Sequence, residues 1–187
     1  MSFRILIADD ERLLRIDLKE LLEDLGYQVV GEARDGLEAL NLIKQENPDV
    51  VILDIKMPRM NGIEVAREVS GEYPVIMLTA YSESQLIEQA RDAGAMAYLT
   101  KPFREGDVSP AIELAVSHFL EKAVLTERVS RLKAQLETRK LLDRAKGLLM
   151  KKERLSEPKA YRRLQEISMN KNKPIKEVAE AVITMLG

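Results

Sequence analysis

Residues 3–11 read FRILIADDE, a short apolar run that ends directly in three acidic residues. A run of this length predicts a buried strand, and the leucines that follow it are spaced as on one face of a helix. The same cycle recurs along the first 120 residues. The predicted strands cover 3–8, 28–33, 50–53, 75–78 and 97–99, and the predicted helices cover 12–25, 37–45, 63–70, 85–92 and a stretch that begins near Val108. Five strands alternating with five helices indicate an α/β fold with a doubly wound parallel sheet.

Polar residues stand just past the ends of four of these strands: Asp9 and Asp10, Asp54, Thr79, and Lys101. The carboxyl ends of parallel strands meet in one crevice, and the flavodoxin-like strand order makes the first and third strands neighbours. The three aspartates can therefore share a cation, and Mg²⁺ suits a few carboxylates that leave room for water and phosphate oxygens. Asp54 could attack a phosphoryl group as a carboxylate nucleophile. Lys101 would then pair with the phosphate, and Thr79 could donate a hydrogen bond to it.

Composition limits the remaining possibilities. The 187 residues include no cysteine, which excludes disulfide and thiolate metal sites and favours a cytoplasmic location. The chain enters its first strand without a charged leader, and no apolar stretch reaches 18 residues, so we expect neither a signal peptide nor contact with a membrane. Net charge is −10 over residues 1–120, +1 over 121–138 and +7 over 139–187. An acidic front and a basic tail suggest two tasks, the second involving a polyanion.

The helix that begins near Val108 has no obvious end before the basic tail. Within residues 121–138, four apolar residues recur at steps of four, three and four: Leu125, Val129, Leu132 and Leu136. This spacing gives two heptads of a coiled-coil seam. We expect a helical coiled-coil linker that pairs two copies of the chain into a homodimer. The alternative is an amphipathic helix that packs on its own domain.

Residues 139–187 are predicted to form a small three-helix bundle. Apolar residues recur at helical spacing in three segments, around Leu141–Leu149, Ala160–Ile167 and Ile175–Leu186. Lysine and arginine concentrate on and between these segments, and such residues bind phosphates with strongly salt-dependent affinity. Tyr161 is the one aromatic residue of the tail, so stacking of bases on the protein would be limited to that side chain.

Four segments together resemble the receiver domain of bacterial two-component response regulators: IADDE, LDIKMPRMNG, MLTAYSE and AYLTKPF. The resemblance covers residues 1–120. It implies that Asp54 is the phosphoacceptor, that the backbone carbonyl of Lys56 joins the aspartates on Mg²⁺, and that a sensor histidine kinase is the phosphodonor. It also implies a cis bond between Lys101 and Pro102. Tyr98 stands where the family keeps a switch aromatic that turns inward as Thr79 moves toward phosphate.

The stretch LLDRAKGLLMKKERLSEPKAYRRLQEISMNKNKPIKEVAEAVI resembles the ANTAR output domain, an RNA-binding module of transcription antiterminators. The helix that usually ends in Ala-Met reads Ser168-Met169 here, which is a mild departure. The resemblance implies that the tail binds structured hairpin RNA. The residues expected to contact RNA are the basic ones: Arg144, Lys146, Lys151, Lys152, Arg162 and Arg163.

The sequence thus predicts a phosphorylation-controlled regulator that binds RNA and promotes antitermination. It is not expected to be an enzyme beyond accepting and losing the phosphoryl group. A phosphatase or phosphomutase would resemble D-x-D at the nucleophile, whereas this chain reads Asp54-Ile55-Lys56. The alternative output is a DNA-binding transcription factor. The last predicted helix carries Lys176, Glu177 and Glu180 rather than many base-reading side chains, which argues against DNA.

Overall fold

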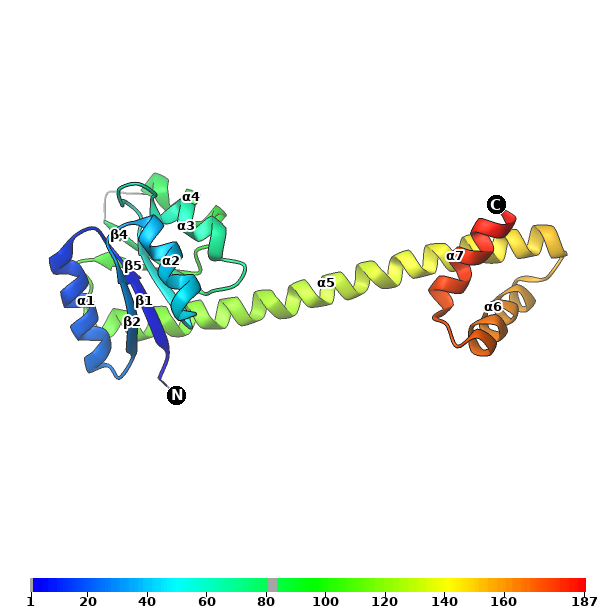
Figure 1. The fold of residues 1–187 in the computed structure, drawn as a ribbon, viewed down its shortest axis with the longest axis horizontal. Helices are drawn as coiled ribbons and strands as arrows, with labels where there is room; N and C mark the ends of the chain where they lie inside the picture. Colours follow the sequence, from blue (N-terminus) through cyan, green and yellow to red (C-terminus); the bar gives the residue numbers. More distant parts are fainter. Residues whose placement is uncertain (1, 81–83) are drawn as a thin grey trace. The chain divides into compact units, whose positions relative to one another are not determined.

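The structure is a computed structural model that describes residues 2–80 and 84–187. Its strands all pair in parallel, in the order β2-β1-β3-β4-β5 (Figure 1). This order confirms the predicted flavodoxin-like sheet, with the first and third strands side by side. The strands are β1 Arg4–Ala8, β2 Gln28–Ala33, β3 Val50–Asp54, β4 Val75–Ala80 and β5 Ala97–Lys101.

Helices alternate with these strands and continue beyond the sheet. They are α1 Arg12–Asp24, α2 Gly36–Glu46, α3 Gly62–Val69, α4 Ser84–Asp92, α5 Glu105–Glu153, α6 Glu157–Lys171 and α7 Ile175–Leu186. The chain divides into two compact units, Met1–Ala123 (unit 1) and Val124–Gly187 (unit 2). No helix in the part of the chain that the structure describes has the length and apolar character needed to cross a membrane.

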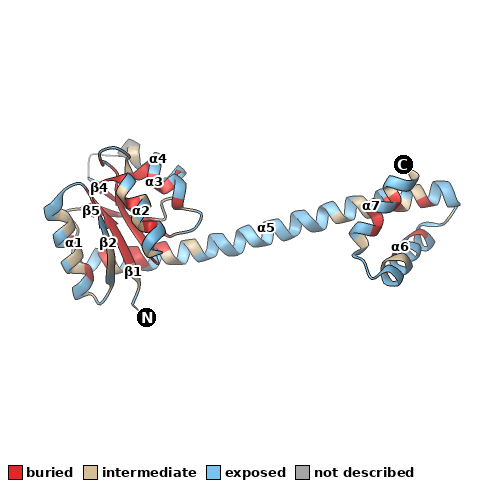
Figure 2. Cartoon of the chain, in the orientation of Figure 1, coloured by how far each residue is buried: buried red, intermediate tan, exposed pale blue. Residues whose placement is uncertain are grey.

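The sheet of unit 1 is packed on both faces. Leu6 and Leu53 contribute to a core cluster on the face covered by α2, α3 and α4, whereas Ile5 and Ile52 contribute to a cluster with residues of α1 and α5. The alternation arises because successive side chains of a strand point to opposite faces. All five residues of β3 are buried, as the red central strands of Figure 2 illustrate. A strand covered on both sides fixes the position of its last residue, Asp54.

Helix α5 runs from Glu105 to Glu153 without a break, so the expected linker helix and the expected first helix of the bundle are one helix. Its start lies three residues before the predicted Val108, because two acids, Glu105 and Asp107, occupy the first turn. Acidic side chains there favour helix because they interact with the unpaired N–H groups of that end. Residues 121–138, the expected linker, therefore lie within this helix.

Unit 2 has a core of its own. Ala145 and Leu149 of α5 pack with Ala160 and Leu164 of α6 and with apolar residues of α7. The chain turns between α6 and α7 at Asn172, whose left-handed backbone ends α6. These contacts are the three-helix packing that the sequence predicts.

The linker seam is exposed in the single chain. Leu125, Val129, Leu132 and Leu136 keep between 49% and 61% of their surface accessible. The alternative in which this face packs on its own domain is therefore wrong for the chain as described. Four exposed apolar residues on one helix face are unusual on a monomer and suggest a surface for association.

Candidate functional site

The predicted acidic site lies at the carboxyl ends of β1 and β3. Carboxylate oxygens of Asp9, Asp10 and Asp54 lie within 4.8 Å of one another. They meet because β1 pairs with β3 in parallel, with Ala8 opposite Leu53. Asp9 and Asp54 are buried, whereas Asp10 is exposed. The site thus has two anchored carboxylates and one at its solvent side.

Lys101, the last residue of β5, supplies the positive charge of this site. Its Nζ lies 2.6 Å from Oδ2 of Asp9 and 2.6 Å from Oδ1 of Asp54. Burial favours the neutral lysine, but hydrogen bonds and attraction from these two carboxylates outweigh it and raise the pKa of Lys101. Lys101 therefore stays charged in the site. The bond from Lys101 to Pro102 is cis, as expected.

Asp54 has an unusual protonation equilibrium for an aspartate. Burial raises its pKa from the ordinary 3.8 to about 6, although the Lys101 ammonium and the Lys56 N–H lower it in part. The negative charge of Asp9 adds to the increase. The Lys56 N–H donates to Oδ2 of Asp54 over 3.1 Å. Near neutral pH the carboxylate is ionised but is held in an environment that disfavours its charge.

The donor set fits a hard divalent cation. Three carboxylates face a single ammonium group, so the site carries excess negative charge that a cation can neutralise. Oxygen donors on two anchored residues and one exposed residue suit Mg²⁺, which keeps several of its waters when it binds proteins. Asp9, Asp10 and Asp54 are the residues that would hold the ion. That the backbone carbonyl of Lys56 also binds the ion stays a prediction.

The loop after β3 is fixed beside Asp54 by two close backbone approaches. A Cβ on Gly62 would lie 2.0 Å from the carbonyl oxygen of Asp54, and one on Gly36 would lie 2.3 Å from that of Met60. Only glycine fits such distances, so the start of α3 presses against the end of β3. The loop therefore carries Lys56 to the acidic site on a short, constrained path.

An ion pair between Arg59 and Asp35 adds to this constraint, and it was not predicted from the sequence. Asp35 is buried at the start of α2, where its side chain also accepts from the Glu38 N–H. Arg59 has a φ of 64°, in the left-handed region. No sequence pattern predicts that a non-glycine residue such as Arg59 will adopt a left-handed backbone. Asp35 followed by Gly36, by contrast, is a recognisable helix start.

Thr79 and Tyr98 lie on the neighbouring strands β4 and β5. Thr79 is buried opposite Thr100, one residue past the pair that joins Asp54 to Leu78. Tyr98 is half-buried, and its hydroxyl donates to the Ile87 carbonyl of α4 over 3.2 Å. Burial raises the pKa of Tyr98. The strand pairing puts Thr79 at the same end of the sheet as Asp54, while Tyr98 is bound to α4.

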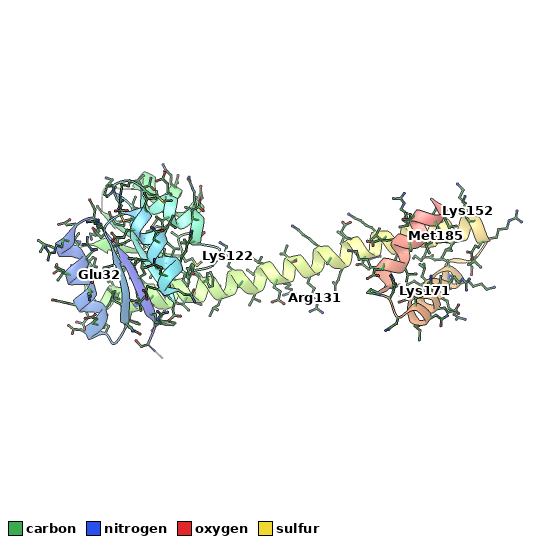
Figure 3. The ribbon with its side chains drawn as sticks, viewed as in Figure 1. Glu32, Lys122, Arg131, Lys152, Lys171 and Met185 are labelled. Carbon is green, nitrogen blue, oxygen red and sulfur yellow. The ribbon has the colours of Figure 1, made fainter. Side chains whose placement is uncertain are left out.

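The residues expected to contact RNA divide into two groups. Arg144, Lys151, Lys152, Arg162 and Arg163 are exposed on unit 2, and Figure 3 shows Lys152 near the end of α5. Lys146 is different, because its Nζ lies 2.9 Å from Asp143 and 2.7 Å from Glu157 of α6, and its side chain is only 17% exposed. The pair with Glu157 joins α5 to α6, whereas the pair with Asp143 lies within α5. The charge of Lys146 is therefore already paired within the bundle.

The doubly wound sheet with its acidic site and the basic helical bundle define a regulator of two parts. The chain belongs to the response regulators: residues 5–128 match the response regulator receiver domain and residues 130–183 match the ANTAR domain. Neither of these is a typical enzyme family. It is 51% identical over 186 residues to the transcriptional regulatory protein PdtaR of Mycobacterium tuberculosis strain H37Rv, which covers 98% of this chain and 91% of that protein.

Other relatives match unit 1. The chemotaxis protein CheY of Thermotoga maritima is 37% identical over 115 residues, which are 60% of this chain and 96% of that protein. A crystal structure of a response regulator receiver domain protein from Clostridium thermocellum superposes with a TM-score of 0.59 at 33% identity, covering 67% of this chain and 99% of that one. These matches agree with the fold described for residues 4–101.

The raised pKa of Asp54 leads to a stability prediction. Asp54→Asn is expected to raise the thermal unfolding midpoint of the metal-free chain at neutral pH by on the order of a few degrees. The folded chain holds the Asp54 proton up to about pH 6, whereas the unfolded chain loses it near 3.8. Deprotonation between those values therefore lowers the stability of the wild type, and the variant lacks this loss.

The unfolding midpoint of Asp54→Asn should exceed that of the wild type only slightly near pH 4. The difference should grow up to about pH 6 and then stay constant. Calorimetry in the presence of a chelator measures it. Asp92→Asn is the matched control because Asp92 is exposed on α4, and its midpoint should follow that of the wild type. If the difference in unfolding midpoint between Asp54→Asn and the wild type shrinks as pH rises, burial does not disfavour the Asp54 charge.

Proposed function

We propose that this response regulator receives a phosphoryl group on Asp54 from a sensor histidine kinase and then binds structured RNA to promote transcription antitermination. The observation that carries the proposal is the buried Asp54 carboxylate beside Lys101 at an acidic, cation-binding site. The ANTAR match and the +7 charge of residues 139–187 support RNA as the output target. The name of PdtaR, a transcriptional regulatory protein, agrees with a role in transcription.

The phosphoryl step follows from the residues of the site. An oxygen of Asp54 attacks phosphorus, the new bond is an acyl phosphate, and the bond from phosphorus to the kinase histidine breaks with its electrons left on the imidazole. Bound Mg²⁺ would neutralise the charge of the phosphoryl oxygens. Lys101 is released from its pair with Asp54 and takes a phosphoryl oxygen as its new partner. Hydrolysis of the acyl phosphate by water resets the site.

The change of state passes from the phosphoryl group to the neighbouring strands. Thr79, at the same end of the sheet, donates its hydroxyl to the phosphoryl group. Movement of Thr79 toward Asp54 opens space on β4, and Tyr98 turns inward after leaving the Ile87 carbonyl. The hydrogen bond from Tyr98 to α4 represents the unphosphorylated arrangement in this proposal.

The proposal divides the chain into a receiver domain over 1–120, a helical linker over 121–138 and an RNA-binding domain over 139–187. Two copies pair through the exposed seam of the linker, because four apolar side chains on one face are stabilised when a second helix covers them. A dimer offers two basic bundles to one RNA. Such a regulator acts in the cytoplasm, where the nascent transcript is made.

The exposed residues Arg144, Lys151, Lys152, Arg162 and Arg163 are assigned to RNA phosphates in this proposal. Lys146 contributes by holding α5 to α6 through Glu157, and it reaches RNA only if its pair with Asp143 or Glu157 opens. Phosphate contacts from side chains of this kind position a nucleic acid without reading its sequence. Selection among RNA shapes has to come from other residues.

Competition binding tests the RNA output. With a phosphoryl analogue such as beryllofluoride present, the chain should bind hairpin RNA more tightly than duplex DNA of equal charge at the same salt concentration. Charge alone cannot favour the less regular polymer, so the preference would come from loop or shape recognition. Replacing Lys151 and Lys152 by alanine should weaken binding and reduce its salt dependence by about one to two units of the logarithmic slope. Equal or tighter binding of duplex DNA would instead favour a DNA-binding transcription factor.

A further inference from the structure

Unit 2 has a groove between α5 and α6 that no residue of the predicted RNA set other than Lys146 lines. Its volume is about 630 Å³, and its polar lining comes from Arg131, Gln135, Thr138, Arg139, Asp143, Lys146 and Tyr161. The α5 members, at positions 131, 134, 135, 138, 139, 142, 143 and 146, recur turn by turn along one side of the helix. All of the lining residues belong to unit 2.

The two sides of the groove differ in chemistry. On α6, Tyr161 keeps 41% of its surface accessible, although a core aromatic would be buried. On α5, Arg131 and Arg139 are exposed (Figure 3 labels Arg131). The Lys146 ammonium, which hydrogen-bonds to Asp143, and the charge of Arg139 lower the pKa of the Asp143 carboxyl, which also lines the groove. Gln135 and Thr138 between them offer an amide and a hydroxyl, which can both donate and accept hydrogen bonds.

The α6 side of the groove, which carries Tyr161, is connected to α5 by an ion pair of Lys146. Lys146 pairs with Asp143 on its own helix and with Glu157 in the first turn of α6. Glu157 lies four residues before Tyr161, so both are on the same face of α6. The pair between Lys146 and Glu157 therefore ties the start of α6 to α5 and helps to hold Tyr161 opposite the groove residues of α5.

We propose that this groove binds an unpaired RNA base, with the base stacked on Tyr161, its edge hydrogen-bonded by Gln135 or Thr138, and the adjoining phosphates paired with Arg139 and Arg131. The assignment rests on the proposed RNA-binding function and specifies how a loop is recognised. RNA loops offer bases that are free to leave the stack, whereas duplex bases are not. An acidic peptide could also pair with the arginines, but an unpaired base offers a planar face for the Tyr161 ring together with a phosphate on either side.

The groove also gives the bundle a means to prefer an RNA loop over other polyanions. The exposed lysines and arginines elsewhere on unit 2 bind any polyanion. The second groove of unit 2, which Leu149, Ile167 and Val182 line with Arg163, has no aromatic side chain among its lining residues. Tyr161 is the single aromatic residue of unit 2, so an aromatic stacking surface can exist only where Tyr161 lies.

The test compares two RNA probes that differ only in bases. Hairpins are selected by the full-length wild-type chain, with beryllofluoride present, from a pool with one fixed stem and randomised loops. A selected hairpin and the same hairpin with abasic loop residues carry equal phosphate charge. The wild type should prefer the base-bearing loop, and Tyr161→Leu should reduce this preference by about 10-fold or more because it removes the stacking surface. Tyr161→Phe should retain it.

Two further variants separate stacking from charge. Arg139→Ala should weaken both probes and lower the salt slope by about one unit, since one phosphate contact is lost. Lys171→Ala removes an equal charge from the second groove and should leave the ratio between the probes unchanged. Circular dichroism melting of each variant shows whether it is folded.

The outcomes distinguish the groove from the function it rests on. If selection enriches no hairpin for the wild type, RNA binding fails and the groove assignment fails with it. If the wild type prefers the base-bearing loop and folded Tyr161→Leu keeps the full preference, the groove assignment alone is overturned. If Tyr161→Phe loses the preference as fully as Tyr161→Leu does, the hydroxyl and not stacking is responsible, which also overturns it.

Discussion

Asp54→Ala is expected to abolish labelling of the chain by acetyl phosphate, a reaction that should depend on Mg²⁺ in the wild type. Asp54 is one of the two buried acids that contact Lys101, and its carboxylate is the nucleophile in the proposed step. Removing the carboxylate leaves no group to form the acyl phosphate, so the loss should be complete. Electrophoresis that retards phosphorylated chains, followed by mass spectrometry, measures the fraction labelled and its position.

The chemistry of the label gives an independent check. An acyl phosphate is cleaved by neutral hydroxylamine, whereas a phosphoserine or phosphothreonine is not. Asp92→Ala serves as the control because Asp92 is an exposed aspartate of the same unit, outside the acidic site. Stoichiometric, hydroxylamine-sensitive labelling of Asp54→Ala would show that another carboxylate is the phosphoacceptor.

Leu132→Asp should weaken dimerisation of the beryllofluoride-treated chain by at least about 100-fold. A buried leucine contributes roughly 1.5–3 kcal/mol, the change occurs in both copies, and an aspartate in the seam also has to be desolvated. Leu132 is 56% exposed in the single chain, so the substitution should leave unit 2 folded. Sedimentation equilibrium over a range of concentrations measures the dissociation constant.

Ser130→Asp is the matched control for this variant. It places the same charge on the same helix, but Ser130 lies outside the steps of three and four that define the seam. Its dissociation constant should stay close to that of the wild type. Identical sedimentation of Leu132→Asp and the wild type at every concentration would show that the seam does not hold two chains together.

The sheet could be predicted from the sequence because its strands are covered on both faces. Such strands appear as continuous apolar runs, and each predicted run overlaps the observed strand to within two residues at either end. The acidic site could be predicted for a related reason. Asp9, Asp54 and Lys101 stand at or just past strand ends, and parallel pairing alone brings these ends together.

What the sequence did not predict depends on contacts between elements. Arg59 reaches Asp35 across 24 positions, and its left-handed backbone has no sequence signature. Lys146 looked like an RNA contact because charge is visible in a sequence, but its partner Glu157 lies on another helix. Arg131 and Arg139 were counted as linker and tail, and only the packing of α6 on α5 puts them opposite Tyr161.

The two glycines that lie against the end of β3 and the loop after it bear on how the natural variation of such a chain should be interpreted. Gly36 and Gly62 touch no phosphoryl group in the proposed step, yet any side chain at either position would overlap a backbone carbonyl. Selection for phosphorylation alone would therefore keep glycine at 36 and 62 as strictly as aspartate at 54. A residue near Asp54 can be invariant because it takes part in the chemistry or because no larger side chain fits. The backbone geometry at that position distinguishes the two causes.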